Sequence, residues 1–173
     1  MASNTYEAIA TVTVGSGGAA NIEFTSIPAT YTDILVKYSL RGSDAANYIN
    51  NRISFNNSTS NYTSKLLYGD GSAAASANHS VTTAIDFSAY STGTSATAST
   101  FSSGEAYIPN YAGSNNKSVS VDHITENNAT AAIAALTAGL WSDSAAITSL
   151  KITPGSGTFA QYSTATLYGI KNS

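Results

Sequence analysis

The chain has no cysteine among its 173 residues. Disulfides, thiol nucleophiles and cysteine-ligated metal sites are therefore all excluded. Charge is also scarce, because Asp, Glu, Lys and Arg make up 10% of the residues, against about a quarter in a typical soluble domain. With seven basic residues against ten acidic ones, the chain has no cationic stripe for phosphate groups, and we expect no binding to nucleic acid.

Long apolar runs are missing too. No stretch approaches the roughly 20 residues that a membrane-spanning helix needs, so we expect no membrane association. Residues 1–6 lack the basic and then apolar pattern of a signal peptide. We therefore expect synthesis in a cytoplasm, and the absence of thiols suits a product that is later exposed outside the cell.

Hydrophobic residues make up 42% of the chain, and aromatic residues 10%, with eleven tyrosines. This content, together with a net charge of only -3, argues against intrinsic disorder. The length fits one domain over residues 1–173, large enough to bury about two-thirds of the surface that the unfolded chain exposes. Tyr, Val, Ile and Thr favour strands, so the composition points to a β protein.

Alternation of apolar and polar residues supports this fold class. In residues 117–125, Val119, Val121 and His123 alternate with polar neighbours, as expected of a half-buried strand. Similar patterns predict strands at residues 6–14, 20–25, 31–40, 52–56, 62–68, 81–87, 105–108, 146–153 and 159–170. About ten short strands with frequent turn signals predict an all-β, antiparallel two-sheet sandwich of jelly-roll type.

Some segments allow more than one interpretation. Residues 131–141 are rich in alanine and could be helical by propensity, but Thr137 and Gly139 interrupt them and strands surround them, so we predict a strand. The glycine-rich turn at residues 15–18 predicts a hairpin between residues 6–14 and 20–25. The low-complexity segments 72–78 and 88–100 are predicted to be loops.

No catalytic constellation stands out. The two histidines are His79 and His123, and the abundance of serine makes a Ser/His/Asp arrangement uninformative, with no nucleophile elbow present. A glycosidase needs two carboxyl groups facing each other, and the acids considered for a polysaccharide-degrading enzyme are Asp122 and Glu126. Most of the ten acids are expected to stabilise turns or strand ends: Glu7, Glu23, Asp33, Asp44, Asp70, Asp86, Glu105, Asp122, Glu126 and Asp143. We expect no enzyme activity.

Metal sites have little support in the sequence. Asp70-Gly71-Ser72 superficially matches a calcium loop, but the remaining ligands of such a loop are missing, and a turn explains the three residues better. A loose set of oxygen donors at Asp44, Asn47, Asn50 and Asn51 is the other option, with weak support. We expect neither a metal nor another cofactor.

Tyrosines give the more interesting pattern. Several lie near predicted loops or strand edges, where a flat ring with a hydroxyl suits protein contact or stacking on sugars. The simpler alternative is that most are half-buried at the rims of the sheets. The predicted partner or glycan contacts are Tyr48, Tyr62, Tyr90, Tyr107 and Tyr111.

Three segments resemble a module that recurs in virion proteins of tailed bacteriophages, especially marine ones. They are residues 22–41 (IEFTSIPATYTDILVKYSLR), 67–72 (LYGDGS) and 137–171 (TAGLWSDSAAITSLKITPGSGTFAQYSTATLYGIK). Residues 73–126 match the module poorly. The resemblance is one of packing, so it carries over no functional residue.

The resemblance implies a structural role on the virion surface. The chain lacks heptads and Gly-X-Y repeats of fibrous segments, which favours a capsid decoration protein bound to the shell. The alternatives are a tail-fibre or tail-associated module that binds a receptor or glycan and, last, the polysaccharide-degrading enzyme. The expected partners are the major capsid protein or tail proteins. We also expect a homo-oligomer, with a trimer as one arrangement.

Overall fold

The computed structural model describes residues 5–87, 91–128 and 132–171. In this part of the chain every regular element is a strand, and all strand pairs are antiparallel. The large sheet has eight strands in the order β1 (Tyr6–Thr13), β14 (Thr164–Ile170), β3 (Asp33–Leu40), β10 (Ser102–Ile108), β11 (Lys117–Thr125), β12 (Ile133–Trp141), β6 (Tyr62–Gly69) and β7 (Ala74–His79). The prediction of an all-β antiparallel fold is confirmed.

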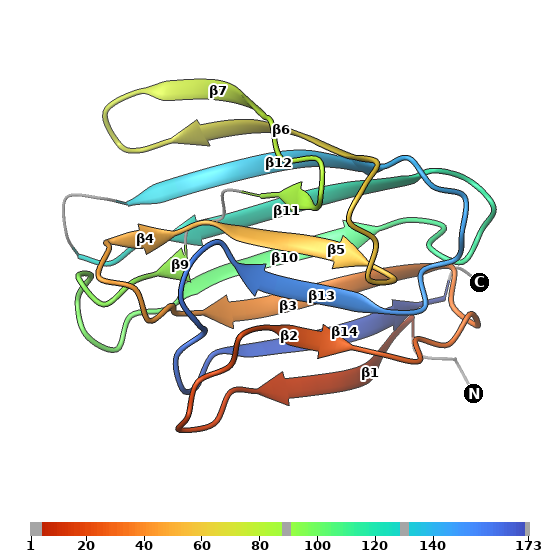
Figure 1. The fold of residues 1–173 in the computed structure, drawn as a ribbon, viewed down its shortest axis with the longest axis horizontal. Helices are drawn as coiled ribbons and strands as arrows, with labels where there is room; N and C mark the ends of the chain where they lie inside the picture. Colours follow the sequence, from red (N-terminus) through yellow and green to blue (C-terminus); the bar gives the residue numbers. More distant parts are fainter. Residues whose placement is uncertain (1–4, 88–90, 129–131, 172–173) are drawn as a thin grey trace.

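A smaller sheet lies across the large one (Figure 1). Its four strands are, in order, β2 (Ile22–Phe24), β13 (Leu150–Pro154), β5 (Asn51–Phe55) and β8 (Ile85–Asp86). A separate pair joins β4 (Tyr48–Ile49) to β9 (Ser91–Thr92). The arrangement is β-sandwich-like, with β1 and β7 as the two edges of the large sheet.

Strict alternation builds the inner face of the large sheet. In both β11 and β12 every second residue is buried, which is the period expected when one face of a strand packs on a core. The predicted strand at residues 117–125 is confirmed at both ends. The strand predicted for residues 131–141 is confirmed over Ile133–Trp141, and the helical alternative is wrong there.

One hydrophobic core joins the two sheets. At one end of it Trp141 from β12 stacks on Tyr62 from β6, with ring centroids 6.0 Å apart, and lies 5.6 Å from Phe55 of β5. Close approach of the layers also depends on Gly139, since a Cβ added there would lie 2.7 Å from the side chain of Ile85 on β8.

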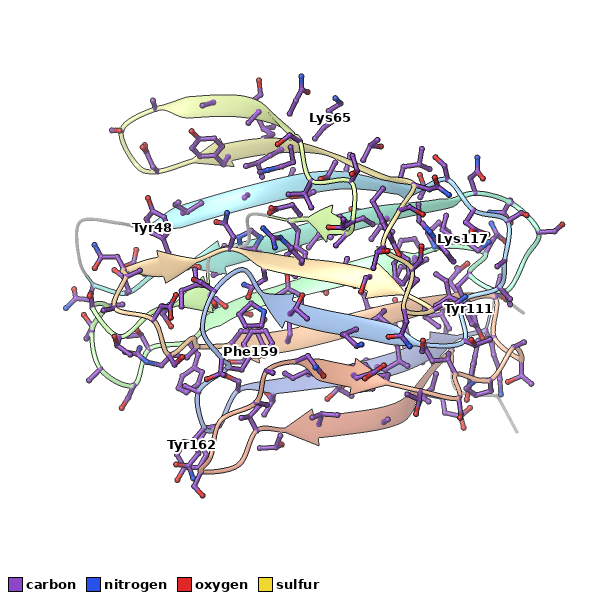
Figure 2. The ribbon with its side chains drawn as sticks, in the orientation of Figure 1. Tyr48, Lys65, Tyr111, Lys117, Phe159 and Tyr162 are labelled. Carbon is purple, nitrogen blue, oxygen red and sulfur yellow. The ribbon has the colours of Figure 1, made fainter. Side chains whose placement is uncertain are left out.

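Lys117 is a fully buried cation at the start of β11. Figure 2 labels this side chain. Its ammonium group donates hydrogen bonds to the carbonyl oxygens of Gly113 and Asn115, which ties the preceding loop to the strand. Burial lowers the pKa of this side chain, and the carboxylate of Asp143 opposes that effect.

The hairpin predicted from the Gly15–Gly18 turn is wrong. The turn itself forms, with the Gly18 N–H donating to the Gly15 carbonyl at 3.1 Å, but the chain then crosses to the other layer. As a result β1 pairs with β14 in the large sheet, and β2 pairs with β13 in the small one. Turn chemistry fixes the local bend but does not determine which strand becomes the neighbour.

Two predicted loops contain strands. The segment at residues 72–78 includes most of β7, whose small residues have little strand propensity but pair with β6 from Ser64 to Gly69. The segment at residues 88–100 includes β9, while residues 88–90 lie outside the described part of the chain. In both cases a partner strand outweighs local composition.

The turn between β6 and β7 confirms the turn interpretation of Asp70. Its Oδ1 accepts hydrogen bonds from the backbone N–H groups of Ser72 and Ala73 and from the Ser72 hydroxyl, at 2.7–2.9 Å. These donors, the Ala73 N–H above all, lower the pKa of Asp70 to about 2. The carboxylate oxygen is therefore used to hold the backbone of the turn.

Candidate binding face

The face of the large sheet turned away from the small sheet, here called the outer face, gathers most of the exposed large side chains. Directly opposite residues of an antiparallel pair share a face, so the strand registers define rows across it. One such row runs Thr11, Thr166, Lys37, Glu105, Asp122, Leu136, Leu67 and Ser76. It passes from small polar residues through charges to apolar side chains.

The charged centre of this row consists of Lys37, Glu105 and Asp122. The Lys37 Nζ lies 3.0 Å from a Glu105 carboxylate oxygen, and this partner raises the pKa of Lys37. Asp122 lies on the other side of Glu105. Its pKa is raised, mainly by desolvation and then by the Glu105 charge. One cation is therefore shared by two neighbouring carboxylates.

Tyrosines gather at one end of the outer face, here called the tyrosine end. A hollow of about 420 Å³ is lined there by Tyr6, Leu35, Lys37, Glu105 and Tyr168. Tyr6 is 56% exposed, whereas Leu35 at the base is buried. An exposed ring beside a buried apolar base and an ion pair offers both stacking and hydrogen bonding.

The opposite end, here called the apolar end, carries Leu67, Ile124 and Leu136, each more than half exposed. They line a hollow of about 430 Å³ together with Ala74 and Ala134, among others. Leu67 and Leu136 are direct cross-strand partners. Adjacent exposed leucines on a sheet face are typical of a surface that contacts another protein.

The two ends belong to one continuous track. A hollow of about 290 Å³ between them shares Lys37 and Glu105 with the tyrosine end, and Asp122 and Ile124 with the apolar end. A further hollow of about 270 Å³ continues past Ile124 toward the turn between β6 and β7. An extended ligand or a flat protein surface can therefore lie across several strands at once.

The predicted tyrosine contacts divide into three groups. Tyr48 on β4 and Tyr107 on the outer face are exposed at 40% and 36%, and they stay predictions. The Tyr107 hydroxyl donates to an Asp33 carboxylate oxygen at 2.8 Å. Tyr90 lies outside the described residues.

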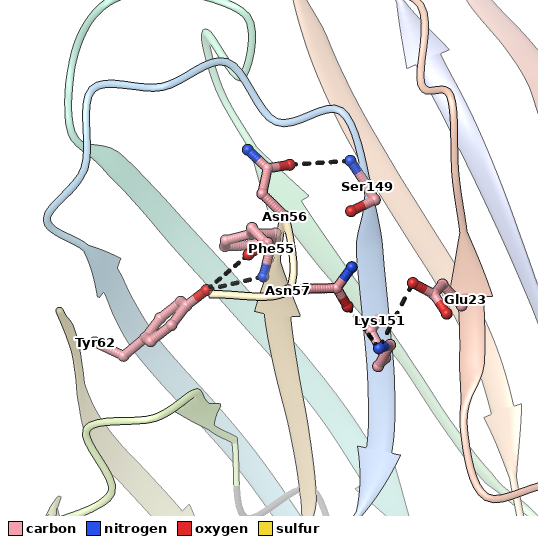
Figure 3. Close-up of polar contacts among 7 residues, drawn as sticks. All are labelled: Glu23, Phe55, Asn56, Asn57, Tyr62, Ser149 and Lys151. Carbon is pink, nitrogen blue, oxygen red and sulfur yellow. Dashed lines mark hydrogen bonds and ion pairs between the residues drawn. The ribbon is translucent and has the colours of Figure 1, made fainter. Parts of the chain in front are cut away.

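Tyr62 and Tyr111 are fully buried, so their assignment as surface contacts is wrong. The Tyr62 hydroxyl accepts from the Phe55 N–H at 2.9 Å and donates to the Phe55 carbonyl at 3.3 Å (Figure 3). The Tyr111 hydroxyl donates to the Pro28 carbonyl. Each ring fills the core while its hydroxyl bonds to backbone groups of another segment of the chain.

The histidine and acid candidates are not brought together. His123 points into the core at 3% exposure, and neither of its ring nitrogens has a hydrogen-bond partner. Burial lowers its pKa to about 4. Asp122 and Glu126 are four residues apart along an extended segment, or about 13 Å between Cα atoms, and the acid that faces Asp122 is Glu105.

Sequence reasoning missed Tyr6, Lys37, Glu105 and Tyr168. Alternation within residues 31–40 and 117–125 gives the side of each strand, so Lys37 and Asp122 could be assigned to an exposed face. The pairing of β3 with both β10 and β14 joins residues more than sixty positions apart, and no local pattern reports it.

The described residues hold no group of three or more His, Asp or Glu side chains that could hold a metal ion. Among the same residues, no helix is long and apolar enough to cross a membrane. No family model, curated protein or solved structure matches this chain.

Proposed function

We propose that the chain is a non-catalytic attachment module of a tailed-bacteriophage virion, a capsid decoration protein that binds the shell through the apolar end of its outer face. The observation that carries the proposal is the exposure of Leu67, Ile124 and Leu136 side by side at one end of the outer face. A contiguous exposed apolar patch on a protein surface commonly marks a site of contact with a partner.

The arrangement of the phage-like segments supports this proposal. Residues 22–41 include β2 and β3, and residues 137–171 include β13 and β14. In the folded chain β3 lies beside β14, and β2 lies beside β13. Segments from the two ends of the sequence thus form adjacent strands in both sheets, as expected when a resemblance reflects one packing unit.

A jelly-roll type of sandwich is part of the same proposal. Its support is the pairing of strands that are distant in the sequence, such as β3 with β10 and β14, and β12 with β6. Such antiparallel neighbours are typical of Greek-key and jelly-roll connections.

Binding to undecorated capsids of the parent phage tests the decoration role. We expect saturable binding that the double substitution Leu67→Ser/Leu136→Ser weakens by 10-fold or more, since each leucine loses roughly 1.5–3 kcal/mol of burial in the interface. The measurement is cosedimentation at increasing protein concentration. Tyr162→Ser, which truncates an exposed ring before β14, is the matched control and should bind normally.

Wild-type protein that does not bind capsids would remove the decoration proposal. Unchanged binding by the double variant would place the contact elsewhere on the molecule. Both leucines are exposed, so the variants should keep the unfolding midpoint of the wild type, and this separates lost contact from lost fold.

A second candidate function, glycan binding by a tail-associated module, is favoured by the hollow at the tyrosine end. There, an exposed Tyr6 ring lies beside Tyr168 and the Lys37–Glu105 ion pair, a combination that can stack on a sugar and bind its hydroxyls.

A glycan array tests this candidate. We expect Tyr6→Ala to abolish any signal, because it removes the most exposed ring of the hollow, and Tyr48→Ala to leave it unchanged. Loss of signal in the Tyr48 variant alone would instead place the glycan near β4. Capsid binding without any glycan signal would eliminate this function.

A further inference from the structure

Strand β7 is an unprotected edge of the large sheet. It pairs only with β6 and leaves its other side without a neighbouring strand (Figure 1). Its sequence, Ala-Ala-Ser-Ala-Asn-His, has no Lys, Arg, Asp, Glu or Pro. Natural proteins usually place such residues, or a bulge, on edge strands to prevent pairing with other chains.

The other edges of the two main sheets are protected. In β1 the register shifts between Ala8 and Ala10, and the nearby Glu7 is held by Lys171 at 3.2 Å. In the small sheet β2 has three residues with Glu23 paired to Lys151, and β8 has two residues with Asp86 near Arg52. Among the described edges of the two main sheets, β7 is a long strand that has neither a register shift nor a charged residue.

The turn geometry identifies the backbone groups of β7 that point outward. The Asp70 N–H donates to the Ala73 carbonyl at 3.3 Å, so Asp70 and Ala73 form a hydrogen-bonded pair. Bonded and non-bonded pairs alternate along an antiparallel ladder. It follows that Ala75 and Ala77 direct their backbone groups to β6, while Ala74, Ser76 and Asn78 direct theirs away from the sheet.

We propose that β7 pairs with β7 of a second copy of this chain, antiparallel about a two-fold axis at Ser76. In this register Ser76 faces its own copy, and Ala74 faces the Asn78 of the other subunit. All three outward-facing residues then form hydrogen-bonded pairs, each of which exchanges two backbone hydrogen bonds. The proposal is independent of the attachment role.

The side chains fit this self-pairing. The outer face at the junction carries Ala74, Ser76 and Asn78, and the inner face carries Ala75 and Ala77. Like charges in directly opposite positions would be destabilising, and none meet across the axis. Because the β1 edge is bulged and charged, pairing stops at a closed dimer rather than continuing into a filament.

The apolar ends of the two subunits become neighbours in this dimer. Leu67 lies directly beside Ser76 on the outer face, so both copies bring their leucines toward the axis. The strand contact by itself is small, and we expect a dimer with a dissociation constant in the micromolar range.

Charge substitution at the axis provides the test. Sedimentation equilibrium from about 1 µM to about 1 mM should show a monomer–dimer equilibrium for the wild type. Ser76→Lys and Ser76→Glu should each be monomeric, because like charges meet across the axis, and an equimolar mixture of the two should regain the dimer. Ser120→Lys, an exposed position on β11, is the control and should dimerise normally.

Hydrogen exchange gives an independent measurement. The amides of Ser76 and Asn78 should become protected as wild-type concentration rises, while those of Ala75 and Ala77 are protected at every concentration. A wild-type chain that stays monomeric to about 1 mM would overturn the proposal. So would dimers of Ser76→Lys as tight as those of the wild type, or a trimer without concentration-dependent protection of the Ser76 amide.

Discussion

Replacing Trp141 by alanine is expected to lower the free energy of unfolding by about 3–5 kcal/mol, the usual cost of truncating a large buried aromatic residue. Trp141 is 1% exposed and packs against Tyr62 and Phe55 from two other strands, one of them in the opposite sheet. Its removal leaves a cavity where the two sheets meet. The loss is a large part of the 5–15 kcal/mol that stabilises a typical domain.

Trp141→Phe separates ring packing from the indole N–H. The Nε1 atom is buried without a hydrogen-bond partner, so phenylalanine keeps an aromatic ring and loses no hydrogen bond. We expect Trp141→Phe to lower the free energy of unfolding by less than half as much as Trp141→Ala does. Urea unfolding should be followed by far-UV circular dichroism, since Trp141 is the one tryptophan of the chain and its fluorescence is lost in both variants.

Leu136→Ala is the control for removal of a large apolar side chain from β12. Leu136 is 55% exposed, and we expect a change within about 0.5 kcal/mol. If Trp141→Ala cost no more than Leu136→Ala, the packing of Trp141 between the sheets would be wrong.

The strands most accurately predicted from the sequence are those with the cleanest alternation. For residues 117–125 the predicted and observed bounds agree, because Val119, Val121 and His123 all face the core. Strand β7 could not be predicted in this way. Its residues are mostly alanine and small polar side chains with no apolar–polar alternation, and pairing with β6 makes it a strand.

The candidate site was harder to predict than the fold because it depends on register between distant strands. Glu105 and Asp122 could each be assigned to an exposed position, but their pairing follows from the ladder between β10 and β11. Tyr62 and Tyr111 were predicted to lie at the surface, and this prediction was wrong. Both lie near strand ends in the sequence, yet their hydroxyls bond to backbone carbonyls and their rings are buried.

The proposed dimer and the proposed attachment surface reinforce each other. Two apolar ends held on one continuous sheet would engage a repetitive capsid surface at two points, and linked binding sites can raise overall avidity by 10²-fold or more. Ser76→Lys should therefore weaken capsid binding through loss of the dimer. Because Ser76 lies directly beside Leu67, the equimolar mixture of Ser76→Lys and Ser76→Glu is the control: recovery of capsid binding together with the dimer distinguishes the loss of avidity from a direct effect of the charge on the contact.

Acid is expected to destabilise the protein through His123. This side chain is buried in the core with both ring nitrogens unpartnered, and desolvation lowers its pKa from 6.5 to about 4. His123 and the buried Tyr38 hydroxyl both lie beside Gly104. Desolvation also raises the pKa of Tyr38, so it stays neutral and supplies no charge to stabilise a protonated imidazole.

The direction of the pH effect follows from which state binds the proton. Above pH 6.5 His123 is neutral in both the folded and the unfolded chain, so it does not make the free energy of unfolding depend on pH. Between pH 6.5 and pH 4 the unfolded chain takes up a proton that the folded chain does not, so the free energy of unfolding falls as the pH falls. The pKa difference corresponds to a loss of about 3 kcal/mol, and below about pH 4 the contribution stops changing.

His123→Leu isolates this contribution, because it replaces the imidazole with an apolar side chain of similar size. The variant should lose less stability than the wild type on going from pH 7 to pH 4, and the difference between the two should reach about 3 kcal/mol. Urea unfolding at several pH values measures it, and subtraction cancels the titration of the carboxylates that both chains share. His79→Leu, on the edge strand β7, is the control. If it flattened the pH profile as much as His123→Leu, the acid sensitivity would not arise from the buried histidine.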